Sequence, residues 1–103
     1  MQYRPEYINF VPIQPYYIGQ FMNNLDVDLA MDFASYNLAY KATISCYRQD
    51  EVIISVVDTN NPTQTTQIII DTRQPHIARF ERSGICVPTR KIANYVTREM
   101  SSY

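Results

Sequence analysis

The residues of types that carry out catalysis show no spacing in this sequence by which a nucleophile, a base or a cofactor site stands out. His76 is the only histidine among the 103 residues, so no Ser/His/Asp or Cys/His arrangement can use more than one imidazole. Its setting, Gln-Pro-His-Ile at the expected start of a strand, is typical of an ordinary loop-edge residue. Gly19 and Gly84 are the only glycines, and two such distant residues cannot form a glycine-rich phosphate loop. We therefore expect no enzymatic activity and no cofactor.

Potential metal ligands are also few. Asp26, Asp28 and Asp32 form a D-x-D-x-x-x-D pattern whose oxygens suit a divalent cation. On a helix, however, Asp26 and Asp28 point apart, and only Asp28 and Asp32 share a side. This favours a solvated acidic face over a metal site. Cys46 and Cys86 match no metal-ligand spacing, and we expect them to be buried thiols rather than a disulfide.

The basic side chains are concentrated in the last third of the chain. Residues 1–71 hold 3 basic and 8 acidic side chains (net −5), whereas residues 72–103 hold 6 basic and 2 acidic ones (net +4). The basic set comprises Arg73, Arg79, Arg82, Arg90, Lys91 and Arg98. Arg90 and Lys91 fall in the expected first turn of a helix, where backbone N–H groups attract anions, so the set is a candidate nucleic-acid surface.

Against this candidate, the sequence pI is near 5.7, whereas nucleic-acid modules are usually basic overall. We favour the alternative that these side chains pair with Asp26, Asp28, Asp32 or another subunit. A split of charge between the two parts of a chain also suits head-to-tail association or an acidic partner.

The elements that must position these groups begin with a helix predicted over residues 24–41. Its apolar stripe has the spacing i, i+4, i+8, i+11 and i+15 and consists of Leu25, Leu29, Phe33, Tyr36 and Tyr40. Asn23 or Asn24 can cap its start, and Lys41 suits its end. No glycine or proline interrupts this stretch.

Four strands and a short helix are expected to follow. The strand segments are 42–47, 51–58, 65–72 and 76–82. Pro88-Thr89 introduces the second helix, with Ile92, Tyr95, Val96 and Met100 on one face. The sequence therefore predicts a single α+β domain over residues 23–103, with one long amphipathic helix, an antiparallel four-stranded meander and a short C-terminal helix.

Residues 1–22 read as an extended N-terminal arm rich in proline and aromatic residues. Pro5, Pro12 and Pro15 restrict the backbone and bias their preceding residues toward extended conformations. The aromatic residues of the arm are Tyr3, Tyr7, Phe10, Tyr16, Tyr17 and Phe21. A disordered tail is usually poor in aromatics, so we expect the arm to lie on a surface. That surface is either its own domain, with 7–10 as an edge strand, or a neighbouring subunit.

The two middle strands are apolar on both faces, which one layer of helices cannot cover. Ile53, Val57 and Ile69 together would form an exposed patch of the kind that marks an interaction surface. Burying each such side chain contributes roughly 1.5–3 kcal/mol. The chain also has 9 tyrosines and is poor in lysine, as protein interfaces are. We therefore expect these three residues and the arm aromatics to form an interface.

The helix–strands–helix order resembles that of double-stranded-RNA-binding domains. Arg90-Lys91-Ile92-Ala93 is similar to the basic start of the last helix in that family. The run of lysines and alanines expected there is missing, and the fourth strand is extra. The resemblance concerns element order, and it implies RNA binding by the basic C-terminal part as an alternative function.

We conclude from the sequence that the expected function is that of a non-enzymatic, self-associating structural or interaction protein. We expect a homo-oligomer, a dimer or larger, and a virus particle or similar assembly is one setting that suits it. Neither a bilayer-spanning apolar run of about 20 residues nor a signal peptide is apparent, so we expect an intracellular protein without membrane partners. No small-molecule substrate is expected.

Overall fold

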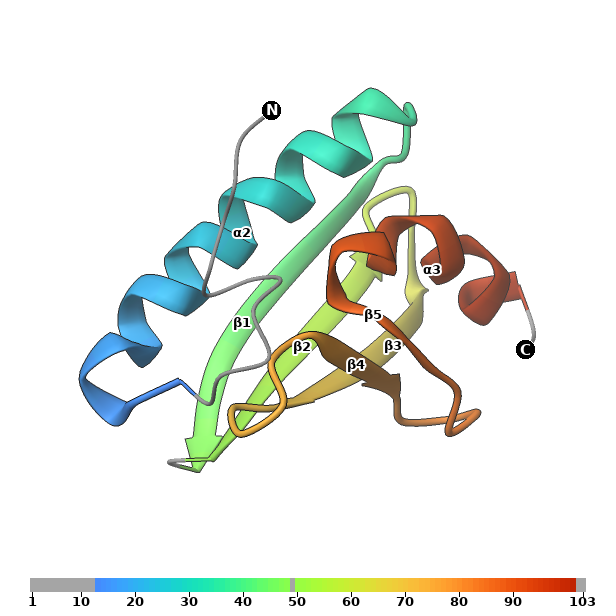
Figure 1. The fold of residues 1–103 in the computed structure, drawn as a ribbon. Coiled ribbons are helices and arrows are strands. Elements are labelled where there is room, and N and C mark those ends of the chain that lie inside the picture. The colour runs from blue at the N-terminus through green and yellow to red at the C-terminus, as the bar shows by residue number, and fades with distance from the viewer. Residues whose placement is uncertain (1–12, 49, 102–103) are drawn as a thin grey trace.

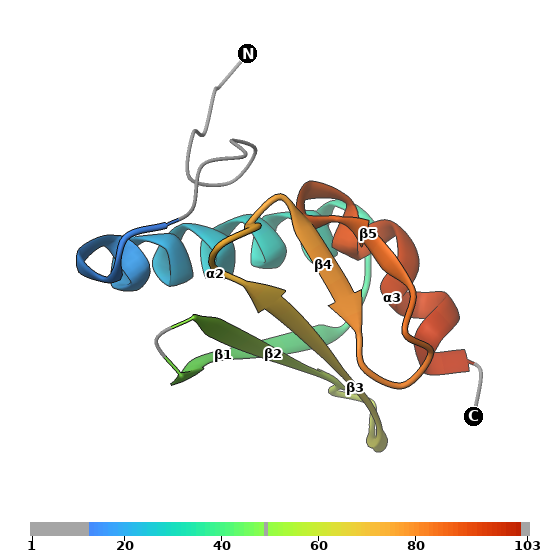
Figure 2. The same cartoon turned by 60° about the horizontal axis from the view of Figure 1, so that its bottom comes forward.

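The computed structural model describes residues 13–101 apart from residue 49. It has two layers, an antiparallel sheet and a pair of helices. The sheet order is β1-β2-β3-β4-β5, so each strand pairs with its neighbour in sequence. The strands are β1 (Tyr40–Arg48), β2 (Glu51–Asp58), β3 (Asn61–Asp71), β4 (Ile77–Phe80) and β5 (Cys86–Pro88). Helices α2 (Ile18–Ser35) and α3 (Ile92–Ser101) lie on the same side of the sheet (Figures 1 and 2).

Each helix follows a short 3₁₀ turn. These turns are η1 (Pro15–Tyr17) and η2 (Thr89–Lys91). The α+β class, the long first helix and the meander order agree with the prediction from sequence. Among the described residues, no helix is long and apolar enough to cross a membrane.

Helix α2 begins and ends six residues earlier than the predicted 24–41. Its core side continues toward the N-terminus through Phe21 and Ile18, so the same stripe is satisfied by an earlier start, and Asn23 and Asn24 lie inside the helix. Tyr36 is the C-cap and Tyr40 already belongs to β1.

A Schellman motif ends α2. Asn37 adopts φ 61°, its N–H donates to the Ala34 carbonyl (3.1 Å), and the N–H of Leu38 donates to the Phe33 carbonyl (2.8 Å). Asparagine tolerates this left-handed conformation better than most residues, because its short polar side chain makes local hydrogen bonds. The predicted continuation of the helix to residue 41 is therefore wrong.

The sheet has five strands where four were predicted. The second predicted strand, 51–58, coincides with β2. The additional strand is β5, which lies between the fourth predicted strand and the second predicted helix. It pairs with β4 through Ile77–Pro88, Ala78–Val87 and Arg79–Cys86. Three residues are too few to show a periodic pattern, and it is this pairing with β4 that makes the segment a strand.

The core lies between the sheet and the two helices. Val52, Ile54 and Val56 of β2 are fully buried, whereas the intervening Ile53, Ser55 and Val57 are only partly buried. The same alternation runs through β3 and β4. One face of the sheet is thus the core face. We call the other side, away from the helices, the open face.

Candidate interaction surface

A row of side chains crosses the open face over all five strands. The strand register places them in the order Ser45, Ile53, Ile69, Arg79 and Cys86. Ile53 and Ile69 are therefore direct cross-strand neighbours near the middle of the sheet. Both are half-buried, although neither helix lies over them.

A second row lies one step further toward the end of β3. Glu51 pairs with Asp71 across β2 and β3, and Ile77 pairs with Pro88 across β4 and β5. Ile77 is half-buried and extends the apolar area onto β4. Ile53, Ile69 and Ile77 form what we call the isoleucine patch, which spans three neighbouring strands.

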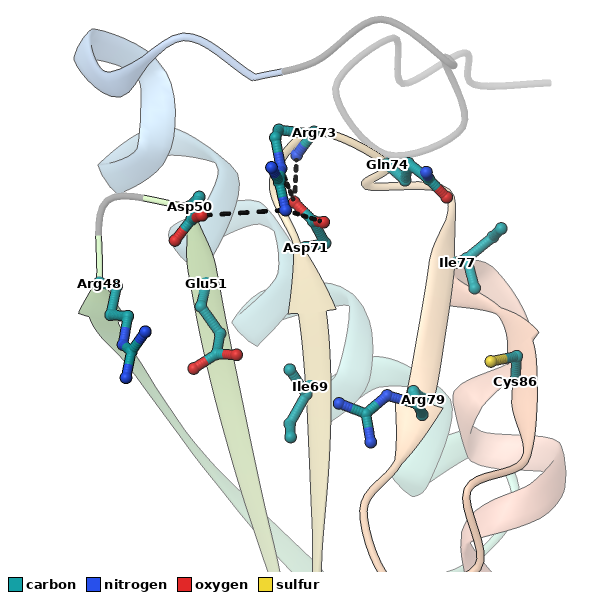
Figure 3. A pocket seen from close by; sticks show the side chains of 10 residues that line it. All are labelled: Arg48, Asp50, Glu51, Ile69, Asp71, Arg73, Gln74, Ile77, Arg79 and Cys86. Atoms are coloured by element: carbon teal, nitrogen blue, oxygen red, sulfur yellow. Dashed lines mark hydrogen bonds and ion pairs between the residues drawn. The ribbon is translucent and has the colours of Figure 1, made fainter.

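A shallow hollow of about 420 Å³ adjoins this patch (Figure 3). Arg73 at its rim donates from Nε to Asp71 Oδ1 (3.0 Å) and from Nη2 to Asp71 Oδ2 (2.9 Å), and its Nη2 lies 3.9 Å from Asp50 Oδ2. The hydrogen bonds from the Arg73 side chain lower the pKa of Asp71 below its ordinary value and raise that of Arg73. Arg73 therefore balances Asp71, and one negative charge remains on this trio of residues.

Arg79 and Glu51 flank the isoleucines on opposite sides. Arg79 is exposed on β4 beside Ile69, and its side chain extends toward that residue (Figure 3). Glu51 lies on β2, one row from Ile53. Within the part of the chain that the structure describes, neither side chain forms an ion pair. Arg79 thus places a cation on the β4 flank of the patch, and half-buried Glu51 places an anion on the β2 flank, where its register partner Arg48 also lines the hollow.

The interface residues predicted on the middle strands lie on one face of the sheet. Ile53, Val57 and Ile69 do lie on the open face, with Val57 at its far end opposite Thr65. Ile77 was not among them, although its alternation with Ala78 and Phe80 places it on the same face as Arg79.

The aromatic residues of the predicted arm do not share one environment. Phe21 is fully buried in the core, so its prediction as an interface residue is wrong; it completes the core side of α2. Tyr16 and Tyr17 are exposed, with ring centroids 5.1 Å apart. Tyr3, Tyr7 and Phe10 lie outside the described residues.

The six basic residues are not gathered on one surface. Arg79 lies on the open face, Arg73 and Arg82 lie in turns, and the other three belong to η2 and α3 in the helical layer: Arg90, Lys91 and Arg98. Arg73 pairs with Asp71 and Asp50. The predicted pairing with Asp26, Asp28 or Asp32 is therefore wrong for Arg73.

The other candidate groups form no reactive cluster in the described part of the chain. His76 is half-buried beside β4. No group of three His, Cys, Asp or Glu residues among those described could hold a metal ion. Cys46 and Cys86 are both exposed, so the prediction of buried thiols is wrong. Cys46 lies on an edge strand next to a β-bulge, and Cys86 faces the open side of the sheet.

No protein family model, curated protein or solved structure matches this chain.

Proposed function

We propose that this protein is a non-enzymatic structural or interaction protein that associates with copies of itself through the open face. The observation that carries the proposal is the isoleucine patch. Ile53, Ile69 and Ile77 lie on three neighbouring strands, on the side of the sheet that neither helix covers. Adjacent apolar side chains in such a position mark an interaction surface.

The arrangement of the patch suits a second copy related by a twofold axis. β3 is the central strand, so an axis running along it places β2 of one copy over β4 of the other. Ile69 then meets its own copy on the axis. The rows of the register are kept, so Ile53 faces Arg79 and Glu51 faces Ile77 of the second copy, and each contact occurs twice. Glu51 of one copy and Arg79 of the other then lie one row apart, where long side chains of opposite charge can meet diagonally.

We expect the self-association through the open face to be weak. Six half-buried isoleucines, three from each copy, contribute about 5–9 kcal/mol of further burial at the usual value per side chain. Association costs roughly 4–15 kcal/mol in lost freedom of motion. The two charge pairs at the rim mainly set orientation. The difference leaves at most about 5 kcal/mol, which corresponds to a dissociation constant of roughly 0.2 mM. Weak single contacts of this kind suit a component of an assembly of many copies, such as a virus particle.

The test is a charge-reversal cycle read out by solution mass over a concentration series. Glu51→Arg and Arg79→Glu should each raise the dissociation constant about tenfold, which corresponds to about 1.4 kcal/mol. The double variant should restore most of the affinity, because opposite charges again lie one row apart across the interface.

The control is Arg90→Glu, which makes the same charge change on an exposed residue of η2, in the helical layer. It should leave the dissociation constant unchanged. A wild-type protein that stays a 12.0 kDa monomer at high micromolar concentration would contradict the proposal. Equal effects of Arg79→Glu and Arg90→Glu would contradict the assignment of the open face.

A further inference from the structure

The two edges of the sheet are unequally protected. At one edge, β5 has three residues and ends in Pro88, which has no N–H to offer another strand. At the other edge, β1 has nine residues and contains no proline. It pairs in regular register over 40–46, before a bulge near Arg48, and Lys41 is the only charged residue in that stretch. The β1 edge therefore lacks most of the features that prevent strand addition.

The helical layer leaves this edge partly uncovered. On the core face of β1, Ala42 and Ile44 are half-buried and Cys46 is exposed. The equivalent residues of β2 are fully buried. A groove of about 530 Å³ runs between α2 and β1, lined by Gly19, Met22, Asn23 and Asp26 on the helix and by residues 41–44 on the strand. The groove and the β1 edge form one continuous site for an extended segment.

We propose that β1 of a second copy occupies this site, paired antiparallel to β1 about Thr43, so that the sheets of the two copies become continuous. This inference rests on the proposed self-association, and it adds a surface distinct from the open face. Strand addition at an exposed edge supplies main-chain hydrogen bonds, while side chains that enter the adjoining groove supply specificity.

The sequence of β1 is suited to pairing with itself. With Thr43 on the twofold axis, Ala42 faces Ile44 of the second copy and Lys41 faces Ser45. Ala42 and Ile44 of both copies, which the helices cover incompletely, then meet on the helix side of the joined sheet. Their contact closes the groove of each copy. The polar residues meet on the open side, with a favourable threonine pair at the centre.

Charge also favours β1 as the occupant. The only cation of the regular stretch, Lys41, does not meet its own copy, so no like charges face each other across the pair. Asp26 and Lys41 of one copy line the same groove, so each copy carries both charges beside the pairing edge. With this edge and the open face both engaged, association continues beyond a dimer, as an assembly component requires.

The experiment is disulfide trapping in the full chain. Thr43→Cys is introduced together with Cys46→Ser and Cys86→Ser, so that the new thiol is the only one. Mild oxidation of the associated protein should give a cross-linked dimer as the main species. The control, Asn94→Cys in the same background, lies on an exposed position of α3 and should remain uncross-linked.

A second variant tests the edge without a cross-link. Thr43→Glu places two negative charges opposite each other on the axis, so it should weaken association about tenfold, whereas Thr43→Val should not. Unimpaired association of Thr43→Glu would overturn the inference. Absence of the Thr43→Cys cross-link would also overturn it.

The outcomes separate the two surfaces. In a face-to-face dimer about β3, Thr43 lies far from its own copy, so a cross-link at 43 reports only the edge. If Ile69→Arg and the charge-reversal variants weaken association but Thr43→Cys does not cross-link, the edge inference fails and the proposed function stands. If the cross-link forms and the open-face variants have no effect, the open-face assignment fails instead. A cross-link that forms only after deletion of residues 1–12 would identify that segment as the occupant and overturn the choice of β1.

Discussion

The rings of Phe33 and Tyr40 meet edge to face, with centroids 5.6 Å apart and planes at 85°. Phe33 lies in the last turn of α2 and Tyr40 opens β1, so this contact orients the helix against the strand that follows it. The hydroxyl of Tyr40 also donates to Thr97 Oγ1 of α3 at 3.3 Å. A single side chain therefore connects the sheet to both helices.

Replacing Tyr40 should reveal which of these contacts matters. Tyr40→Ala should lower the free energy of unfolding by about 2 kcal/mol, because it removes both the ring contact and the packing of a half-buried aromatic. Tyr40→Phe keeps the ring and should cost less than about 1 kcal/mol, since only an exposed hydrogen bond is lost. Urea denaturation measures both values. Equal losses would show that the ring contact contributes nothing.

The end of α2 gives a second prediction. Asn37 holds a φ of 61°, which costs a non-glycine residue about 1–2 kcal/mol. Asn37→Gly should therefore leave stability unchanged or raise it slightly, whereas Asn37→Ala should lower it by about 1 kcal/mol. The comparison of the two melting temperatures checks this, and a more stable alanine variant would contradict the Schellman ending.

Two aromatic residues of the predicted arm should respond differently to substitution. Phe21→Ala should cost about 3–5 kcal/mol, because Phe21 is fully buried in the core. Tyr16→Ala should stay within about 0.5 kcal/mol, because Tyr16 is 87% exposed. Chemical denaturation distinguishes these cases.

Deleting parts of the predicted arm tests the same difference in burial. Circular dichroism shows whether each shortened protein still folds. Deletion of residues 1–12 should leave the domain folded, whereas deletion of residues 1–22 should unfold it, because it removes Ile18 and Phe21. A folded protein after the longer deletion would contradict the role given to these two core residues.

Acid conditions should weaken the turn after β3. The Arg73 hydrogen bonds lower the pKa of Asp71 below its ordinary 3.8, so the folded state holds this carboxylate charged more readily than the unfolded state does. The stabilisation is present above about pH 4 and is lost as the pH falls through the lowered pKa. Because the pair is exposed, the effect should be small and should shrink in high salt.

The measurement is the difference in melting temperature between the wild type and Asp71→Asn. This difference should be greatest near neutral pH in low salt and should vanish in strong acid. A difference that grows as the pH falls would have the wrong sign for this ion pair.

The distribution of basic residues leads to a prediction about nucleic acid. Because the six are divided between the open face, the turns and the helical layer, we expect binding to double-stranded RNA at physiological salt to be weaker than about 100 μM. Titration of a labelled duplex at two salt concentrations measures it. Tight binding that falls linearly with the logarithm of salt and is lost in Arg90→Ala and Lys91→Ala would support the RNA-binding alternative.

Local sequence patterns were sufficient for much of this fold. The strand at 51–58, the core stripe Leu25–Leu29–Phe33 and the existence of a second helix follow from apolar periodicity, which depends only on neighbouring residues. The two-sided isoleucine strands likewise indicated that some apolar residues would remain on a face without helices. Periodicity could not place the ends of α2, since Tyr36 and Tyr40 continue the same spacing beyond the point where Asn37 ends the helix.

The tertiary structure decided which distant residues became neighbours. Ile53, Ile69 and Arg79 share a row only because of the hydrogen-bonded register of three strands, and β5 is a strand only because β4 pairs with it. The groove beside β1 likewise depends on where α2 packs against the sheet. These features come from contacts between segments far apart in the chain. The free energy of those contacts depends on strand pairing and side-chain packing, which no local pattern of residues contains.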